Sequence, residues 1–173
     1  MRISYLMLFV TIPAAWSQPP SDPYYAQVDT LRQQAKAAFD RENARETAGL
    51  CKDAISTYDS NICLGKENDK TLANYNEFAG ALRSMLALKP PHEEEVLNVS
   101  GPTGKPLSSA EKAQDFDAME AAWTKYRQLA CSAAFNLYKS GTAAPGQQLS
   151  CNLALYRSHM RELAGIYYIR FNN

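Results

Sequence analysis

The longest stretch without glycine or proline, residues 107–140, most constrains what this chain can fold into. It opens with Ser108 and Glu111, three residues apart, which is the spacing of a capping box at the start of a helix. Apolar residues then recur in alternating steps of three and four, namely Phe116, Met119, Trp123, Tyr126, Ala130, Ala133 and Leu137. Because this spacing keeps one face of a helix apolar, the sequence predicts a long helix that ends before Gly141 and packs on a core.

Trp123, Tyr126 and Arg127 fall on this predicted helix. We interpret the two aromatic residues as core anchors whose polar tips lie near the surface, in preference to a ligand-stacking role. Arg127 follows Trp123 by four residues, so the two side chains share a face of the helix. The favoured interpretation is that Arg127 stacks on Trp123 or pairs with a carboxylate of another helix. A role in binding is the alternative.

Residues 18–48 predict an N-terminal helix after a polar, proline-rich lead-in. Asp22 followed by Pro23 is typical of an N-cap and a first helical residue, and Gly49 stops the helix. The apolar face is thin and consists of Val28, Leu31, Ala35, Ala38 and Phe39. We expect the charged residues of this helix, Glu42 among them, to form a solvated face.

Two further helices are predicted from the same spacing. One runs from about Asp69 to Leu88, after Gly65, and prolines 90–91 end it. Its apolar residues are Leu72, Tyr75, Ala79, Leu82 and Leu86. The last helix follows a turn at 140–147, and its apolar residues are Leu149, Leu153, Tyr156, Met160, Leu163 and Tyr167. A short turn between two long amphipathic helices predicts an antiparallel hairpin.

The four cysteines form no CxxC pair, which argues against a zinc site and against thioredoxin-like redox chemistry. We interpret them as two structural disulfides. Cys131 falls late in the first arm of the predicted hairpin and Cys151 early in the second, so we expect these two to pair. Cys51 and Cys63 then close a short loop that holds one helical turn. Four cysteines allow three connectivities, and the sequence alone does not decide among them.

The first 17 residues have the features of a secretory signal peptide. Arg2 precedes an apolar run over residues 3–12, small residues follow, and cleavage is expected near Ser17/Gln18. The apolar run is too short to span a membrane, and no transmembrane segment is predicted in the mature chain. Removing Arg2 from the 18 basic residues leaves 17 against 18 acidic residues, a net charge of −1. This balance argues against a nucleic-acid partner and, with the disulfides, favours a periplasmic or secreted protein.

No motif in the sequence predicts an enzyme, a metal site or a cofactor. The two histidines, His92 and His159, belong to no HExxH pair, and the sequence has neither a GxSxG motif nor a phosphate-binding loop. Carboxylate pairs such as Asp115 and Asp117 occur by chance in charged helices. A hydrolase that uses helical carboxylates is the least favoured hypothesis, and it requires two acids that converge in a cleft.

The cysteines and their surroundings resemble a known family. Cys51 and Cys63 stand ahead of a helix that contains Tyr75-Asn76, and the motif Trp123-x-x-Tyr126-Arg127-x-x-x-Cys131 is followed by Gly141 and Cys151. Over about residues 48–165 this pattern resembles the N-terminal domain of the LprI-like lysozyme inhibitor family. The chain departs from the family pattern at Glu120, where a glutamine is expected, and at His159, where an arginine is expected.

The resemblance implies an all-helical, disulfide-bonded domain, and the family name, which comes from a member that inhibits lysozyme, makes lysozyme inhibition the leading hypothesis for activity. The resemblance also implies that the four cysteines are structural and that Trp123, Tyr126 and Arg127 form a family-signature core. The long segment 89–107, rich in proline, is expected to be a loop and carries the acidic run His92, Glu93, Glu94 and Glu95. The favoured interpretation of such a run is a solvated face. Because lysozymes are commonly basic and have a cleft, the alternative is that this run is a partner-binding loop, and we keep it as the candidate contact.

Together these observations predict an all-α, disulfide-stapled bundle of three to four helices. The expected organisation is a signal peptide over 1–17, an N-terminal helix over 18–48 and an LprI-like helical domain over 49–173. The leading hypothesis is a secreted or periplasmic, non-enzymatic binding protein, with a lysozyme or another envelope protein as its partner. The alternative is an envelope-associated structural or interaction module with no inhibitory activity. An exposed apolar groove or a self-associating helix face would favour that alternative.

Overall fold

The computed structural model describes residues 22–99, 101–102 and 104–167, and these residues fold into a bundle of helices. The elements are α1 (Pro23–Ala48), α2 (Thr57–Ala87), α3 (Glu93–Leu97), α4 (Ser109–Leu137) and α5 (Ala144–Ile166). Within the described residues the only β-type pairing is an isolated bridge between Gly101 and Gly104. The all-α prediction is therefore confirmed. The predicted signal peptide, 1–17, lies outside the described residues.

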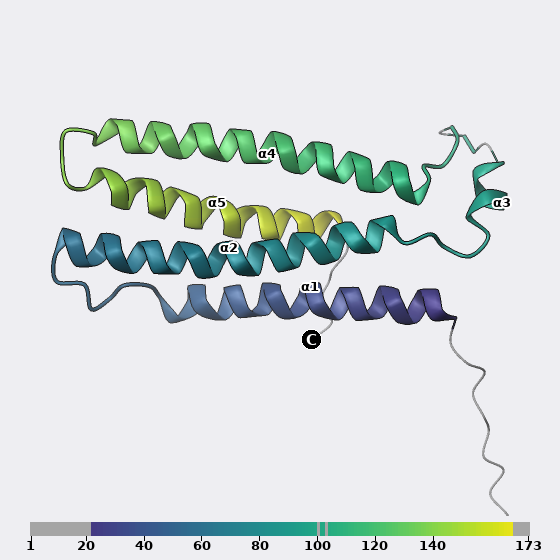
Figure 1. Ribbon diagram of the computed structural model, residues 1–173, viewed down its shortest axis with the longest axis horizontal. Helices are drawn as coiled ribbons and strands as arrows, with labels where there is room; N and C mark the ends of the chain where they lie inside the picture. Colours follow the sequence, from purple (N-terminus) through teal and green to yellow (C-terminus); the bar gives the residue numbers. More distant parts are fainter. Residues whose placement is uncertain (1–21, 100, 103, 168–173) are drawn as a thin grey trace, which may run out of the picture.

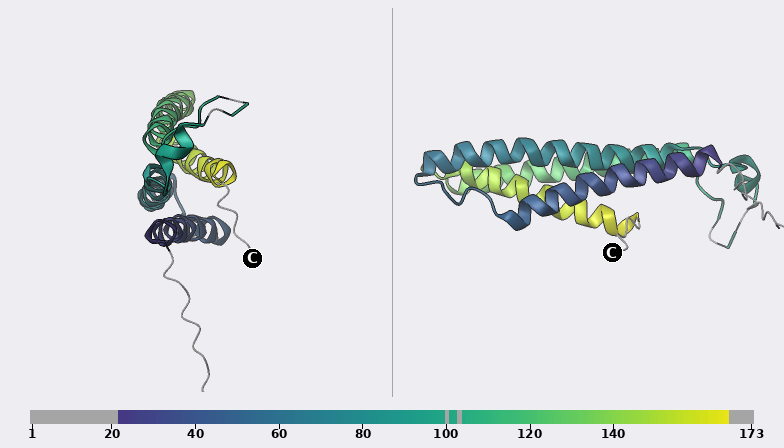
Figure 2. Two further views of the ribbon diagram at one scale, coloured as in Figure 1. Left: turned by 90° about the vertical axis from the view of Figure 1, so that its right-hand side faces the viewer. Right: turned by 90° about the horizontal axis from the view of Figure 1, so that it is seen from below.

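The four long helices lie lengthwise beside one another, and α3 sits beyond one end of them (Figure 1). Seen end on, α2 and α5 occupy the middle, and α1 and α4 form opposite edges (Figure 2). In agreement with this arrangement, α2 packs against α1, α4 and α5, and α4 also packs against α5. The N-terminal helix is therefore a packed part of the bundle.

The boundaries of α1 follow the predicted local signals. The Asp22 side chain accepts a hydrogen bond from the Tyr24 amide at 2.9 Å, and Pro23 is the first helical residue. Gly49 ends the helix with a φ of 76°, which favours glycine. One prediction for this helix is wrong. Glu42 does not lie on the solvated face but is buried with Ala35, Ala38 and Phe39.

The second helix begins earlier than predicted. It starts at Thr57, where the Ser56 hydroxyl accepts from the Asp59 amide at 3.1 Å, and continues through Gly65. A glycine inside a helix costs about 1 kcal/mol relative to alanine. Tertiary hydrogen bonds on either side offset that cost, since Asn61 donates to the Thr142 carbonyl at 3.2 Å and Asn68 to the Leu149 carbonyl at 2.8 Å.

The buried face of α4 differs from the predicted one. The capping box of Ser108 and Glu111 is present, and Phe116 is buried, but Tyr126 is 59% exposed and Leu137 is 82% exposed. A strict three–four repeat averages 3.5 residues per turn, so over three heptads it drifts by about 60° around a helix of 3.6 residues per turn. The buried face instead follows the true helical period to Cys131. The prediction that Tyr126 is a core residue is wrong.

The core lies where α1, α2, α4 and α5 meet, and Trp123 packs against its edge. The predicted face of α5 is confirmed, because Leu153, Tyr156, Met160 and Leu163 are all buried. On α2, Leu72 is 39% exposed, whereas Thr71 and Phe78 are fully buried. The largest core side chains are Phe39, Tyr75, Phe78, Leu82, Phe116, Tyr156, Met160 and Leu163.

Both predicted disulfides are present. Cys51 is bonded to Cys63 with a Cα–Cα distance of 5.8 Å, and Cys131 is bonded to Cys151 with a Cα–Cα distance of 5.4 Å. The first disulfide closes the turn from α1 to α2, and the second spans the turn from α4 to α5. Both turns lie at the same end of the bundle (Figure 1). The bundle thus consists of two helical hairpins, each bridged near its turn.

The segment 89–107 is not a continuous loop, since it contains the short helix α3. Glu93, predicted to contact a partner, is buried and accepts a hydrogen bond from the Ser109 amide at 2.5 Å. Glu93 therefore caps the start of α4, together with the capping box. Its carboxylate is occupied inside the protein, and the prediction that it forms part of a binding loop is wrong for this residue.

Candidate functional site

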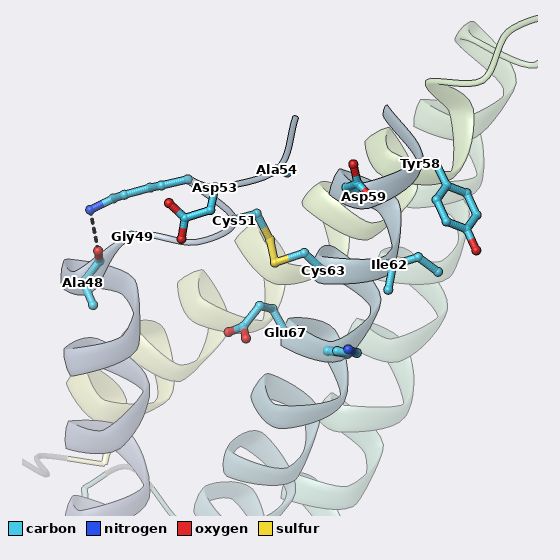
Figure 3. Close-up of a pocket in the computed structure, with 12 residues that line it drawn as sticks. Ala48, Gly49, Cys51, Asp53, Ala54, Tyr58, Asp59, Ile62, Cys63 and Glu67 are labelled. Atoms are coloured by element: carbon cyan, nitrogen blue, oxygen red, sulfur yellow. Dashed lines mark hydrogen bonds between the residues drawn. A yellow bond between two sulfur atoms is a disulfide. The ribbon is translucent and has the colours of Figure 1, made fainter. Parts of the chain in front are cut away.

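A cavity of about 710 Å³ opens at the disulfide end of the bundle. It lies between the end of α1, the connecting segment and the first turns of α2 (Figure 3). Ala48 and Gly49 form one wall, and Tyr58, Ile62 and the disulfide form the other. A concave surface of this size with apolar and polar lining is the default candidate for a binding site.

Local backbone features hold the cavity wall in place. After Gly49, Cys51 also adopts a left-handed conformation, with φ of 55°, which turns the chain back toward α2. The disulfide then fixes Cys51 to Cys63 on the second turn of α2. Lys52 Nζ donates to the Ala48 carbonyl at 2.6 Å and so covers the end of α1. The wall is therefore a cross-linked turn that needs little ordering when a partner binds.

Large apolar side chains are exposed around the cavity. Tyr58 is 74% exposed and projects from the same side of α2 as Ile62, four residues later (Figure 3). Ile55, in the connecting segment, is 95% exposed and lines a neighbouring hollow between α2 and the start of α5. Both Ile55 and Tyr58 are therefore largely in solvent. Covering such side chains contributes about 25 cal/mol for each Å² of apolar surface removed from water.

Carboxylates accompany these apolar groups. Glu67, on the cavity wall, forms ion pairs with Lys70 at 2.8 Å and Arg45 at 2.5 Å. The hydrogen bond from Lys70, with the charge of Arg45, outweighs burial and holds the pKa of Glu67 below its ordinary value. Asp53 and Asp59 also line the cavity (Figure 3). Lys52 and Lys66 line it as well, so the lining carries both signs of charge. Asp59 accepts a hydrogen bond from the Ser56 hydroxyl at 2.6 Å.

The predicted signature residue Trp123 belongs to a different, enclosed cluster in the middle of the bundle. The His159 ring stacks on Trp123 at a centroid distance of 4.2 Å, and its Nε2 lies 2.8 Å from Glu120 Oε1. The Tyr75 hydroxyl donates to the same carboxylate. Burial, and then Glu120, raise the pKa of Tyr75 far above its usual range, so the hydroxyl keeps its proton. These groups satisfy one another, and Glu120 and Trp123 are only partly exposed.

Arg127 joins α4 to α5. Its guanidinium lies 4.6 Å from the Tyr156 ring centroid and 5.7 Å from that of Trp123, within the range of a cation–π contact. Its Nη1 donates to Asn152 Oδ1 at 2.5 Å. The predicted stacking on Trp123 is confirmed, whereas the partner on the neighbouring helix is an amide and not the expected carboxylate.

A buried ion pair between α1 and α5 was missed by sequence reasoning. Glu42 accepts hydrogen bonds from Arg157 at 2.8 Å, from Thr71 at 2.8 Å and from Asn74 at 2.9 Å. Burial raises the pKa of Glu42, but these three hydrogen bonds and the charge of Arg157 outweigh it, so the pKa lies below its ordinary value. The sequence held one signal of this burial. Glu42 follows the apolar Phe39 by three residues, so the two side chains lie on the same face of α1.

The predicted acidic run is not brought near the cavity. Glu94 and Glu95 are exposed on α3, where Glu94 pairs with Lys89 at 2.9 Å and Glu95 lies 3.2 Å from His92 Nδ1. This short helix sits at the end of the bundle opposite the two disulfides (Figure 1). The structure therefore presents two separate candidate contact surfaces, one at each end.

The described residues assemble no metal site, since none of their groups of three or more His, Cys, Asp or Glu side chains can hold an ion. Asp117, one of the noted helical carboxylates, is held by the Arg83 guanidinium through two contacts of 2.7 Å. No helix in the described part of the chain combines the length and the apolar character that crossing a membrane requires.

The fold and the site define a small disulfide-bonded helical protein that exposes apolar and acidic side chains around a cross-linked turn. Its class is fixed by comparison with protein-family models. The model described as "Lysozyme inhibitor LprI" matches residues 51–163, and the chain belongs to this family. The match includes all four cysteines and the α2 wall of the cavity. Searches of curated proteins and of solved structures find no match.

Proposed function

We propose that the chain is a secreted or periplasmic, non-enzymatic inhibitor that acts by binding lysozyme. The observation that carries the proposal is the family match over residues 51–163, which spans both disulfides. Disulfides form and persist in oxidising compartments, which include the periplasm and the cell exterior. Lysozymes act on cell walls from that side of the membrane, so inhibitor and enzyme would meet there.

We infer that the enzyme contacts the rim of the cavity at the disulfide end. Interface energy is concentrated in a few large, well-packed side chains, with tyrosine among the most enriched. Tyr58, Ile55 and Ile62 are already exposed on a turn that the Cys51–Cys63 disulfide holds in shape. Asp53 and Asp59, which line the cavity, offer carboxylates to a basic enzyme, although Asp59 already accepts from Ser56. Since the net charge of the mature chain is only −1, this attraction is local and does not arise from the whole molecule.

The acidic surface of α3, formed by His92, Glu94 and Glu95, is the alternative contact. It also carries two exposed carboxylates, and its exposed apolar side chains are Val96 and, just after α3, Val99, which are smaller than Tyr58. The two surfaces lie at opposite ends of the bundle (Figure 1), so substitutions at one leave the other intact. Their contributions are therefore separable by experiment.

The test is a cell-wall lysis assay with the purified, oxidised mature protein and several lysozyme types. We expect dose-dependent inhibition that the combined variant Tyr58→Ala/Ile62→Ser weakens at least about tenfold, since losing anchor side chains costs 1–2 kcal/mol or more. The matched control is Glu94→Gln/Glu95→Gln, which also changes two exposed residues and should leave inhibition within about twofold of the wild type.

Each outcome of this assay has a defined meaning. Inhibition that responds to the α3 variant and not to the rim variant would move the contact to α3 and refute the assignment of the cavity. Absence of inhibition with every lysozyme type would refute the proposed function itself. Circular dichroism of each variant shows that a loss of inhibition is not a loss of folding.

A second candidate function is an envelope-associated interaction module without inhibitory activity. One observation favours it, namely that α4, at the edge of the bundle opposite α1 (Figure 2), carries exposed apolar side chains at Tyr126, Leu129 and Leu137. A protein that inhibits no lysozyme yet associates through this face would support this candidate.

A further inference from the structure

A second apolar surface runs along α4, on a face turned away from the core. Its residues, which we call the α4 stripe, are Ala122, Tyr126, Leu129, Ala133 and Leu137, all of them exposed. Leu129 is 64% exposed, and Leu137 more so. Steps of four, three, four and four place these residues on one side of the helix, over a length of about 22 Å. Because α4 forms an edge of the bundle (Figure 2), the other helices leave the stripe open.

The chemistry of the surrounding surface marks the α4 stripe as an interaction surface. After Glu120, which is engaged with His159, α4 contains no acidic residue. Its two cations in this part are Lys125 and Arg127, and Arg127 points inward to Asn152. The residues beside the stripe are therefore mostly small and uncharged. Contiguous apolar surface of this kind on a monomer commonly indicates a binding face.

Charge placement along α4 identifies the occupant. Asp115 precedes Tyr126 by eleven residues, about three turns, so it lies in line with the stripe at its N-terminal end. Lys139 lies just beyond the C-terminal end of α4, and both side chains are exposed. Glu111 accepts hydrogen bonds from Ser108, and Asp117 is held by Arg83, which leaves Asp115 as the informative acid of these turns. The helix thus has an acid at one end of its apolar stripe and a lysine at the other.

We propose that the α4 stripe pairs with the same stripe of a second copy of this chain, antiparallel and about a two-fold axis. A two-fold axis makes an interface self-complementary, so every contact occurs twice. With the axis near Arg127, Asp115 of each copy faces Lys139 of the other, and the two Tyr126–Leu129 segments meet at the centre. A parallel pair would instead bring like charges together at both ends.

The size of the stripe sets the expected strength of this dimer. Two helices that meet over about 22 Å bury an area near the lower limit for specific interfaces, roughly 1,000 Å² in total. The dimer is therefore weak, with a dissociation constant on the order of micromolar. Its formation does not depend on lysozyme inhibition. The cavities, which lie on the α1–α2 side at the disulfide end, stay open at opposite ends of the dimer.

The test is sedimentation equilibrium of the oxidised mature protein over about 1–200 µM, a range that brackets micromolar dissociation constants. We expect a monomer–dimer equilibrium. Leu129→Lys, at the centre of the stripe, should raise the dissociation constant at least tenfold. The matched control is Ile55→Lys, which places the same charge on another exposed apolar residue and should leave the constant unchanged.

Charge exchange distinguishes the antiparallel arrangement from other dimers. Asp115→Lys should weaken the dimer severalfold, and Asp115→Lys combined with Lys139→Asp should restore it. If Asp115→Lys strengthens association, the helices are parallel and the proposal is wrong. A protein that stays monomeric over the whole range, or a dimer insensitive to Leu129→Lys, would equally overturn it.

Discussion

The buried ion pair of Glu42 and Arg157 yields the sharpest stability prediction. Glu42 lies on α1 and Arg157 on α5, and only 2% and 10% of their side chains are exposed. The perturbation is Glu42→Leu, which keeps side-chain volume but removes the carboxylate. Arg157 is then left as a buried charge without a counterion, and Thr71 and Asn74 lose their acceptor.

The expected magnitude follows from that geometry. Removing one partner of a buried ion pair lowers the free energy of unfolding by about 3–5 kcal/mol, mostly because the remaining charge is uncompensated. For a chain of this length about 1 kcal/mol shifts the melting temperature by 2–4 °C, so the midpoint should fall by roughly 6–20 °C. Adding Arg157→Met removes the orphaned charge, so the double variant should be more stable than the sum of the single effects by about 1–3 kcal/mol.

The assay is urea and thermal unfolding followed by circular dichroism, with both disulfides intact. Glu46→Leu is the matched control, because Glu46 also joins α1 to α5, through Arg161 at 2.8 Å, but both side chains are at least 40% exposed. Exposed pairs contribute about 0–1 kcal/mol. The reasoning is refuted if Glu42→Leu costs no more than Glu46→Leu, or if the two substitutions at Glu42 and Arg157 are simply additive.

Three further predictions concern pH, capping and the cross-link. The folded pKa of Glu42 lies below its ordinary value of 4.5, so the stability that its carboxylate contributes is complete above that pH and is lost as the pH falls through the folded pKa. Acid unfolding of Glu42→Gln should therefore depend less steeply on pH than that of the wild type. Equal slopes would count against this account. Glu93→Ala should lower the free energy of unfolding by about 0.5–2 kcal/mol in urea titrations, because α4 loses a cap; no change would mean that water replaces the carboxylate without loss. Cys51→Ser/Cys63→Ser should lower the free energy of unfolding by about 3 kcal/mol in the same titrations, because the disulfide restricts the unfolded chain over a sequence separation of 12. A loss below about 1 kcal/mol would contradict this chain-entropy argument.

Features encoded by neighbouring residues were predictable from the sequence. The start of α1 at Pro23 depends on Asp22, and the start of α4 depends on Ser108 and Glu111, all within one turn. The Cys131–Cys151 pair followed from the hairpin that contains it. In each case the interacting groups are close in sequence, so their spacing alone carries the information.

Features that depend on distant partners were not predictable. Glu42 resembles a surface acid until Arg157, 115 residues away, is known to lie beside it. Gly65 resembles a helix stop, but contacts from the α4–α5 turn and from α5 hold α2 continuous. Glu93 resembles part of a free acidic run until the Ser109 amide is placed against it. On α4, the predicted apolar stripe combined residues that face the core with residues that face solvent. The spacing of apolar residues alone does not tell which of them another helix covers.

The location of the two disulfides also shapes how the chain reaches this fold. Each bridge closes a local turn, so the oxidised chain already holds α1 near α2 and α4 near α5 before the bundle forms. The remaining step is the docking of one hairpin on the other, and residues 88–108 tether them at the far end (Figure 1). The entropic cost of closing a loop rises by only about 0.6 kcal/mol for each doubling of its length. Insertions between α3 and α4 should therefore be tolerated far better than insertions beside either cysteine pair, which makes that connection the natural place for length variation within this architecture.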